Sequence, residues 1–278
     1  MRSRKVKRMI RVDYFVITMP RSTTADAHFP SIIGQYVSKP QEDRIMQYYG
    51  YRGDNKVFVG QSSDRIMIWS SGQHAHYVAK TLNTNVFESF SVARIDLQVT
   101  ITSLDADYMI EYIQPNKVYK ATKVTNVNEK GTTLYVGAPT SNIRLRVYNK
   151  TAESGIIPDG GGEYVRFELQ CRNQYADKAF TAFRNNMVRS FYFMVIKRMI
   201  DSYTYKLVEG AIRSSDEELF VDDFPVSKDD PIARKKRWLE QSVLPALRRL
   251  LVEDKQYVDN FVKLLYNGVD DGSSVDMY

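Results

Sequence analysis

The stretch RLRVYNK, residues 144–150, combines a tyrosine with three positive charges. Apolar and polar residues alternate strictly along it, which predicts a β-strand with one buried face and one open face. The open face carries four polar side chains, Arg144, Arg146, Tyr148 and Lys150. Cations stabilise a phenolate, so they lower the cost of deprotonating a tyrosine, and they also attract a phosphodiester. Tyr148 is therefore a candidate nucleophile for cutting DNA or RNA.

Two more stretches, ARIDLQVTIT and EYVRFELQCR, alternate in the same way and add carboxylates. Their polar faces carry Arg94 and Asp96 in the first, and Arg166, Glu168 and Arg172 in the second. If the three strands neighbour one another in an antiparallel sheet, Asp96 and Glu168 meet on its open face and suit a hard cation, Mg²⁺ or Mn²⁺. Such a metal would polarise a phosphodiester that Tyr148 attacks. Alternation by itself favours a plainer interpretation, in which each polar face is the solvent side of an ordinary half-buried sheet.

These side chains need a sheet to position them, and the rest of the chain supplies further strands and helices. Runs rich in β-branched and aromatic residues predict strands at residues 12–18, 56–60, 65–70, 117–126 and 134–136. Helical tendencies or helical spacing occur at residues 31–37, 42–49, 71–82 and 177–199. This mixture predicts an α+β fold with a mostly antiparallel sheet, an open polar face and flanking helices.

The chain is expected to divide near residue 214. Residues 1–213 would form the sheet-based domain, and residues 214–278 a helical C-terminal part with a disordered tail. The C-terminal part would contribute DNA-binding or dimer contacts. Its basic cluster includes Lys235 and Arg237, which would contact phosphates, although a solvated helix end explains the cluster equally well. The candidate DNA-binding residues are Arg94, Arg144, Arg166, Arg172, Lys235 and Arg237.

The composition narrows the class of protein. Lys and Arg number 39 against 33 Asp and Glu, and the resulting net charge of +6 favours an anionic partner, although it can also be only a solubility feature. The single cysteine, Cys171, excludes an internal disulfide and a cysteine-based metal site, and it favours a reducing cytoplasm. Three histidines argue against His-rich zinc catalysis. No long apolar run exists that would span a membrane.

The strings ARIDLQVTI, LYVGAPTSNIRLRVYNKTAE and YVRFELQCR, in this order, resemble the signature blocks of the replication initiation factor family (Rep_trans). The family comprises rolling-circle plasmid initiators and related relaxases of conjugative elements. RIMIWSSGQHA and WLEQSVLPAL resemble two further segments of the family, so the resemblance covers most of residues 12–250. It implies a protein that nicks one DNA strand at an origin or transfer origin with the help of a divalent metal. Unwinding would need a separate helicase, because the sequence contains no P-loop. The cut would leave a free 3′-OH and a 5′-phosphotyrosyl bond.

The resemblance also assigns roles to particular residues. It implies Tyr148 in R-V-Y-N-K as the nucleophile, with Asp96 in R-I-D and Glu168 in R-F-E-L as metal ligands. Lys150 and Arg146 would stabilise developing charge. The remaining candidates are a supporting acid, Glu153, and three competing tyrosines, Tyr135, Tyr164 and Tyr175.

Two positions depart from the family pattern. The family usually has a second acid four residues after the R-I-D aspartate, where this chain has Thr100, and its usual Y-D-K contains Asn149 here. The first change removes one expected carboxylate ligand from the metal site. It leaves open whether Asp13 or Glu163 supplies a ligand instead. It also supports the alternative of a non-catalytic DNA-binding relative. An RNA-binding module resembling an RRM would need exposed aromatics on the sheet, and the predicted open faces carry only one tyrosine.

Overall fold

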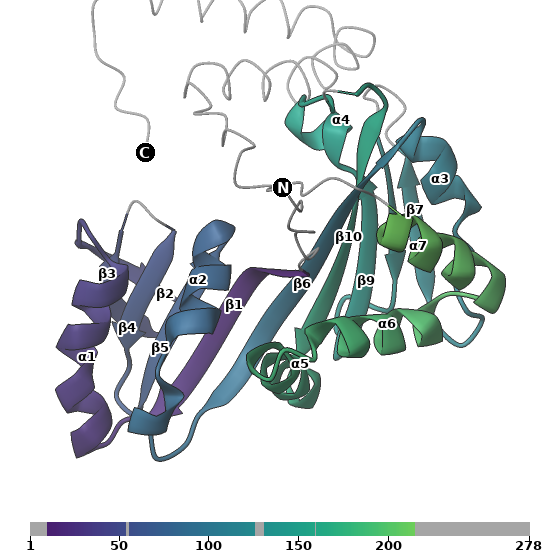
Figure 1. Ribbon diagram of the computed structural model, residues 1–278. Helices are drawn as coiled ribbons and strands as arrows, with labels where there is room; N and C mark the ends of the chain where they lie inside the picture. The colour runs from purple at the N-terminus through teal and green to yellow at the C-terminus, as the bar shows by residue number, and fades with distance from the viewer. Residues whose placement is uncertain (1–9, 54–55, 126–130, 159, 215–278) are drawn as a thin grey trace, which may run out of the picture. The chain divides into compact units, whose positions relative to one another are not determined.

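The computed structural model describes residues 10–53, 56–125, 131–158 and 160–214. All of them belong to the first of two units into which the chain divides, Met1–Phe224. Ten strands form one sheet in the order β2-β3-β4-β5-β1-β6-β10-β9-β8-β7, and neighbouring strands pair antiparallel throughout (Figure 1). Helices accompany this sheet, so the predicted α+β class is confirmed.

The strands are β1 (Arg11–Pro20), β2 (Gln41–Ile45), β3 (Tyr48–Arg52), β4 (Val57–Gln61), β5 (Arg65–Ser71), β6 (Ser91–Ser103), β7 (Ala121–Thr125), β8 (Thr132–Val136), β9 (Ile143–Asn149) and β10 (Glu163–Arg172). The α-helices are α1 (Thr23–Tyr36), α2 (Gln73–Thr81), α3 (Ala106–Tyr112), α4 (Lys150–Ser154), α5 (Gln174–Arg184), α6 (Val188–Met199) and α7 (Ser202–Ser214). The three strongly alternating stretches are therefore strands β6, β10 and β9, and they lie side by side.

One face of the sheet is apolar and forms the core with the helices. Ile95, Leu97, Leu145, Phe167 and Leu169 alternate along the three central strands and are completely buried. Removing a large apolar side chain of this kind from water stabilises the fold by about 1.5–3 kcal/mol. The alternation in the sequence thus fixes which face of each strand turns toward the helices.

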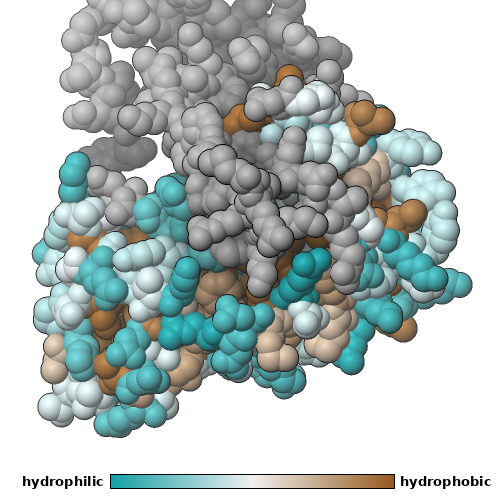
Figure 2. Space-filling model, in the orientation of Figure 1, coloured by the Kyte–Doolittle hydropathy of each residue, from teal (hydrophilic) through white to brown (hydrophobic). Residues whose placement is uncertain are grey.

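The helices cover this apolar face. α5 packs on β6 and β10, α2 packs on β1 and β5, and α3 packs on β8 and β9. Tyr192 of α6 is completely buried and donates a hydrogen bond of 3.0 Å to the backbone oxygen of Phe167, which fastens this helix to β10. Figure 2 shows the molecule in the orientation of Figure 1. On this side, the surface of the described residues is mostly hydrophilic, with apolar residues in separate patches.

The helical prediction for residues 42–49 is wrong, because this segment forms the β2–β3 hairpin. Ile45 pairs with Tyr48, which leaves Met46 and Gln47 as the turn. Met46 has a positive φ of 52°, as tight hairpin turns require. Tyr48 packs with Phe58 in a small apolar cluster on the sheet. This contact across strands outweighs the local helical tendency.

The helix expected from Asp177 begins three residues earlier, at Gln174, and ends at Arg184. Asp177 does not cap it; its Oδ1 accepts a hydrogen bond of 2.8 Å from the backbone N–H of Val92 and so ties α5 to β6. The chain then turns at Asn186, which has a positive φ of 58°, before α6 begins.

Among the described helices, none combines the length and the apolar character that a membrane-spanning helix needs.

Candidate functional site

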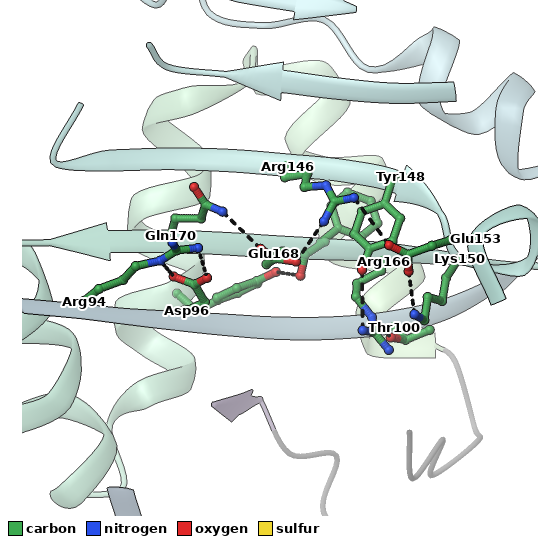
Figure 3. Close-up of polar contacts among 12 residues, drawn as sticks. Arg94, Asp96, Thr100, Arg146, Tyr148, Lys150, Glu153, Arg166, Glu168 and Gln170 are labelled. Carbon is green, nitrogen blue, oxygen red and sulfur yellow. Dashed lines mark hydrogen bonds and ion pairs between the residues drawn. The ribbon is translucent and has the colours of Figure 1, made fainter. Parts of the chain in front are cut away.

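Strand pairing places the predicted site residues in rows across three strands. From β9 through β10 to β6, the rows are Tyr148–Arg166–Thr100, Arg146–Glu168–Gln98 and Arg144–Gln170–Asp96. At the end of β10, Arg172 pairs with Arg94. The labelled polar side chains of these rows gather on one side of the sheet, and helices lie behind it (Figure 3). The structure therefore brings the predicted nucleophile and the predicted metal ligands onto one face.

Tyr148 sits between two arginines. The guanidinium carbon of Arg146 lies 3.9 Å from the centre of its ring, and Nη1 of Arg166 donates to its hydroxyl oxygen over 3.4 Å. Tyr148 is nevertheless only 4% exposed. Burial raises the pKa of Tyr148, and the charge of Arg166 offsets this only in part. The arginines do lower the cost of deprotonating Tyr148, as expected, but burial outweighs them, so the phenol is protonated at neutral pH.

Lys150 is the first residue of α4 rather than a strand residue. Its Nζ lies 2.5 Å from Oε2 of Glu153, whose other oxygen lies 3.5 Å from Nη2 of Arg146. Burial alone would raise the pKa of Glu153, but the hydrogen bond and charge of Lys150, together with nearby arginines, outweigh it and lower that pKa. Glu153 thus holds both predicted charge-stabilising residues beside Tyr148.

Asn149 points to the helix side and has a structural part there. Its Oδ1 accepts from the backbone N–H of Ala152 at the start of α4 (2.9 Å). Its Nδ2 donates to Oε2 of Glu163 over 3.2 Å and to Oδ1 of Asp107 over 3.4 Å. An aspartate at this buried position would face two carboxylates, so the local charges favour an amide here.

Asp96 and Glu168 lie diagonally across β6 and β10, and each is partnered by an arginine. Arg94 donates from Nε and Nη2 to the two oxygens of Asp96, over 2.9 and 2.5 Å. Burial raises the pKa of Asp96 to about 7, against the opposing effect of Arg94. Nη1 of Arg146 lies 3.6 Å from Oε2 of Glu168. A hard cation fits the type of these donors, but it would compete with both guanidinium groups.

No group of three or more His, Cys, Asp or Glu residues in the described part of the chain can hold a metal. Glu163 does not extend the acid pair, because its Oε2 accepts from the backbone N–H of Ala106 on the helix side (2.9 Å). Asp13 is close enough for its charge to raise the pKa of Asp96 further. Thr100, at the position where the resemblance led us to expect a second acid, accepts a hydrogen bond of 3.1 Å from Nε of Arg166.

The polar face also carries aromatic residues that the alternation of the three central strands did not predict. Arginines stack on them: Arg94 on Tyr14 at 4.3 Å, Arg144 on Tyr135 at 4.0 Å and Arg52 on Trp69 at 5.2 Å. The expectation of a single tyrosine on this face is therefore wrong. Tyr14 alternates with buried residues inside a predicted strand, which was the available signal. Aromatic and cationic groups in one surface are what single-stranded nucleic acids bind.

The other predicted residues are less central or lie elsewhere. Nη1 of Arg172 donates to the backbone oxygen of Pro139 and so holds the turn before β9. Tyr175, a competing nucleophile, lies on α5, whereas Tyr135 pairs with Arg146 and shares the face of Tyr148. Lys235 and Arg237, the two C-terminal candidates, are outside the described residues, as is the expected helical part from residue 215 onward.

Comparison with known proteins confirms the resemblance. A family model, described as replication initiation factor, matches residues 90–219 and so includes β6, β9 and β10. The solved structure of a rolling circle replication initiator protein from Geobacillus stearothermophilus is similar, with a TM-score of 0.55, 15% sequence identity and coverage of 72% of this chain and 95% of that chain. No curated protein sequence matches. At this identity the structural likeness shows the fold, and the family match supports a role in replication initiation.

Proposed function

We propose that this chain, whose residues 90–219 match the replication initiation factor family, is a metal-dependent DNA nicking and joining enzyme that initiates rolling-circle replication or conjugative transfer. One observation carries the proposal. The hydroxyl of Tyr148 accepts from Nη1 of Arg166, whose buried Nη2 has no hydrogen-bond partner among the described residues. A phosphate oxygen bound at that free donor would lie close to the phenol, as nucleophilic attack requires.

The reaction is a transesterification. The phenol oxygen of Tyr148 forms a bond to phosphorus while the bond from phosphorus to the 3′ oxygen breaks, and the phenolic proton is finally returned to that 3′ oxygen. The 5′ phosphate stays on the enzyme, so the phosphodiester energy is kept for rejoining and no ATP is needed. Burial raises the pKa of Tyr148, so the phenol carries its proton before DNA binds, and we expect that proton to leave as the bond to phosphorus forms. Arg146 and Arg166 would stabilise the charge that develops.

Asp96 and Glu168 would hold the divalent cation, Mg²⁺ or Mn²⁺. Bound there, the cation would polarise the scissile phosphate and help to orient it. Lys150 sits beside Glu153 at the start of α4 and would neutralise a non-bridging oxygen on the same side as Arg146. Glu153 contacts both Lys150 and Arg146 and acts by positioning these two side chains.

DNA is the partner that this surface suits. Arg94, Arg144 and Arg146 each stack on an aromatic ring of the polar face, which offers bases a surface and phosphates a charge. A separate helicase would unwind the DNA duplex. That this chain forms a homodimer is also a prediction.

A second candidate function is DNA binding without cleavage. The observation that favours it is the acid pair, since Asp96 and Glu168 are both paired with arginines and Thr100 stands where the family usually has a second acid after the R-I-D aspartate. In such a protein the sheet and its basic face would serve only to hold DNA.

The test is incubation of the purified protein with supercoiled DNA carrying its candidate origin, in Mn²⁺, Mg²⁺ or EDTA. Products are denatured in SDS and probed for protein joined to DNA. We expect metal-dependent nicks with 5′ attachment, lost in Tyr148→Phe and retained in the matched variant Tyr135→Phe on the same face. Attachment that survives Tyr148→Phe would assign the nucleophile to another tyrosine. Bound but uncut DNA in every metal condition, on a verified origin, would favour the binding function.

A further inference from the structure

Tyr135 on β8 and Arg144 on β9 form a pair that the nicking chemistry does not use. The guanidinium carbon of Arg144 lies 4.0 Å from the centre of the Tyr135 ring, and both side chains are partly exposed. Arg144 precedes Tyr148 by four residues on β9, which is about 13 Å along a strand. Arg144 is therefore too far away to contact the phosphate that Tyr148 would attack.

The charge of Arg144 is available for an anion. Arg94 and Arg146 are each paired with a carboxylate, whereas Arg144 makes no ion pair with an acid among the described residues. Its Nε is also buried without a hydrogen-bond partner in the described part of the chain. A guanidinium in this state favours phosphate, whose oxygens match its fork of N–H donors.

The ring of Tyr135 belongs to a row of planar groups on the polar face. Tyr135 pairs directly with Arg146 across β8 and β9, and the guanidinium carbon of Arg146 lies 3.9 Å from the centre of the Tyr148 ring. The row thus leads from the predicted nucleophile to Arg144. Nucleic-acid bases stack on aromatic rings and guanidinium planes when they are unpaired and can be splayed out of a helix. The row therefore suits an unpaired strand better than a duplex.

We propose that Tyr135 and Arg144 form a subsite for one unpaired nucleotide beside the cut, whose base stacks on Tyr135 while Arg144 binds its phosphate. The inference rests on the proposed function for the strand being DNA and for the place of the cut, but the subsite itself is argued from this pair. Before DNA binds, the guanidinium covers the ring. A base replaces it there, because stacking on an aromatic ring is stronger than an exposed cation–π contact, and the guanidinium turns to the phosphate.

The test measures binding of the full chain to fluorescein-labelled oligothymidylate and to an abasic strand of equal length, by fluorescence anisotropy. Tyr135→Leu removes the ring, and its matched control is Tyr203→Leu, at an exposed tyrosine of α7. We expect Tyr135→Leu to bind oligothymidylate at least about fivefold more weakly, and the abasic strand as wild type does. Tyr135→Phe keeps the ring and should bind both strands as wild type does. If Tyr135→Leu does not fold, Tyr135→Thr takes its place, because strands accommodate threonine well.

Arg144→Met tests the phosphate contact, with Arg21→Met as its matched control. The variant should bind both strands more weakly. The slope of log affinity against log salt concentration should become shallower by about 0.7, because one phosphate contact is lost. Tyr135→Leu should leave that slope unchanged, since the ring carries no charge.

The outcomes separate this inference from the proposed function, because neither strand carries an origin and only binding is measured. Wild-type affinity of Tyr135→Leu for oligothymidylate, or an equal loss of affinity for the abasic strand, overturns the stacking of a base on Tyr135. An unchanged salt slope in Arg144→Met overturns the phosphate contact. If the chain binds as expected but never cuts origin DNA, the subsite stands and the nicking function fails.

Discussion

Replacing Arg166 with methionine should slow the attachment of Tyr148 to DNA while changing the free energy of unfolding very little. Arg166 is 4% exposed, and its guanidinium donates to Thr100 and Tyr148 over 3.1 and 3.4 Å. At 3.4 Å and an effective dielectric constant of about 20, a guanidinium and a phenolate attract by about 5 kcal/mol, which is an upper bound. Removing one donor that stabilises transition-state charge typically costs about 10²–10³ in rate. We therefore expect tyrosyl attachment to DNA to slow by about 10²–10³-fold.

The expected effect of the same change on folding is small. The variant loses two hydrogen bonds, each contributing about 1 kcal/mol, but it also removes the buried Nη2 that has no partner, which costs about as much. Methionine keeps the aliphatic stem in place. The free energy of unfolding should change by less than about 1 kcal/mol.

The assay pairs single-turnover attachment to origin DNA with urea unfolding. Arg21→Met is the matched control, because it removes an arginine from a surface ion pair with Asp26 and should cost no more than about 1 kcal/mol. It should leave attachment unchanged. Attachment by Arg166→Met at the wild-type rate would exclude a role for Arg166 in stabilising the transition state. A loss of more than about 2 kcal/mol of stability would show instead that Arg166 is a structural residue.

Three further predictions concern the surroundings of the site. Asn149→Asp adds a charge beside two carboxylates and should lower the free energy of unfolding by about 2 kcal/mol or more, measured in urea at neutral pH. Tyr192→Phe removes the hydrogen bond to Phe167 and should cost about 1 kcal/mol in the same assay, without loss of helix by circular dichroism. Glu153 has a lowered pKa in the fold, so its contribution is present above its unfolded pKa and is lost as pH falls through the folded one. Glu153→Gln should therefore be less stable than wild type at pH 7, and thermal unfolding should show the difference shrinking on acidification; a constant difference would mean that the pair with Lys150 does not matter.

Strict alternation made the central strands predictable. In β6, β9 and β10 the period of two is a local property, and the buried face needs only apolar side chains at every second position. The β2–β3 hairpin was not predictable in this way, because Tyr48 is stabilised by packing with Phe58 on another strand, β4, which the local sequence pattern does not show. Short segments in which helical and strand patterns overlap are decided by such tertiary contacts.

The candidate site was predictable as a face but not as a set of partners. Spacing alone put Tyr148 and Asp96 on polar faces, and the strand order brought those faces together. The spacing did not show that Arg94, two residues away on the same strand, donates hydrogen bonds to both carboxylate oxygens of Asp96. It also did not show that burial would raise the pKa of Tyr148 despite its cationic neighbours. Desolvation depends on the whole surroundings of a group, which no local pattern contains.

The position of Tyr148 is set less by its own contacts than by the core beneath it. Leu145 and Val147 are completely buried on the opposite face of β9, so a slip of one residue would bury charged side chains and turn Tyr148 toward the helices. Asn149 then caps α4 immediately after the tyrosine and prevents the strand from continuing. The apolar residues of this strand and the cap that ends it therefore hold the hydroxyl opposite Arg166, and the side chains around it are left to serve chemistry.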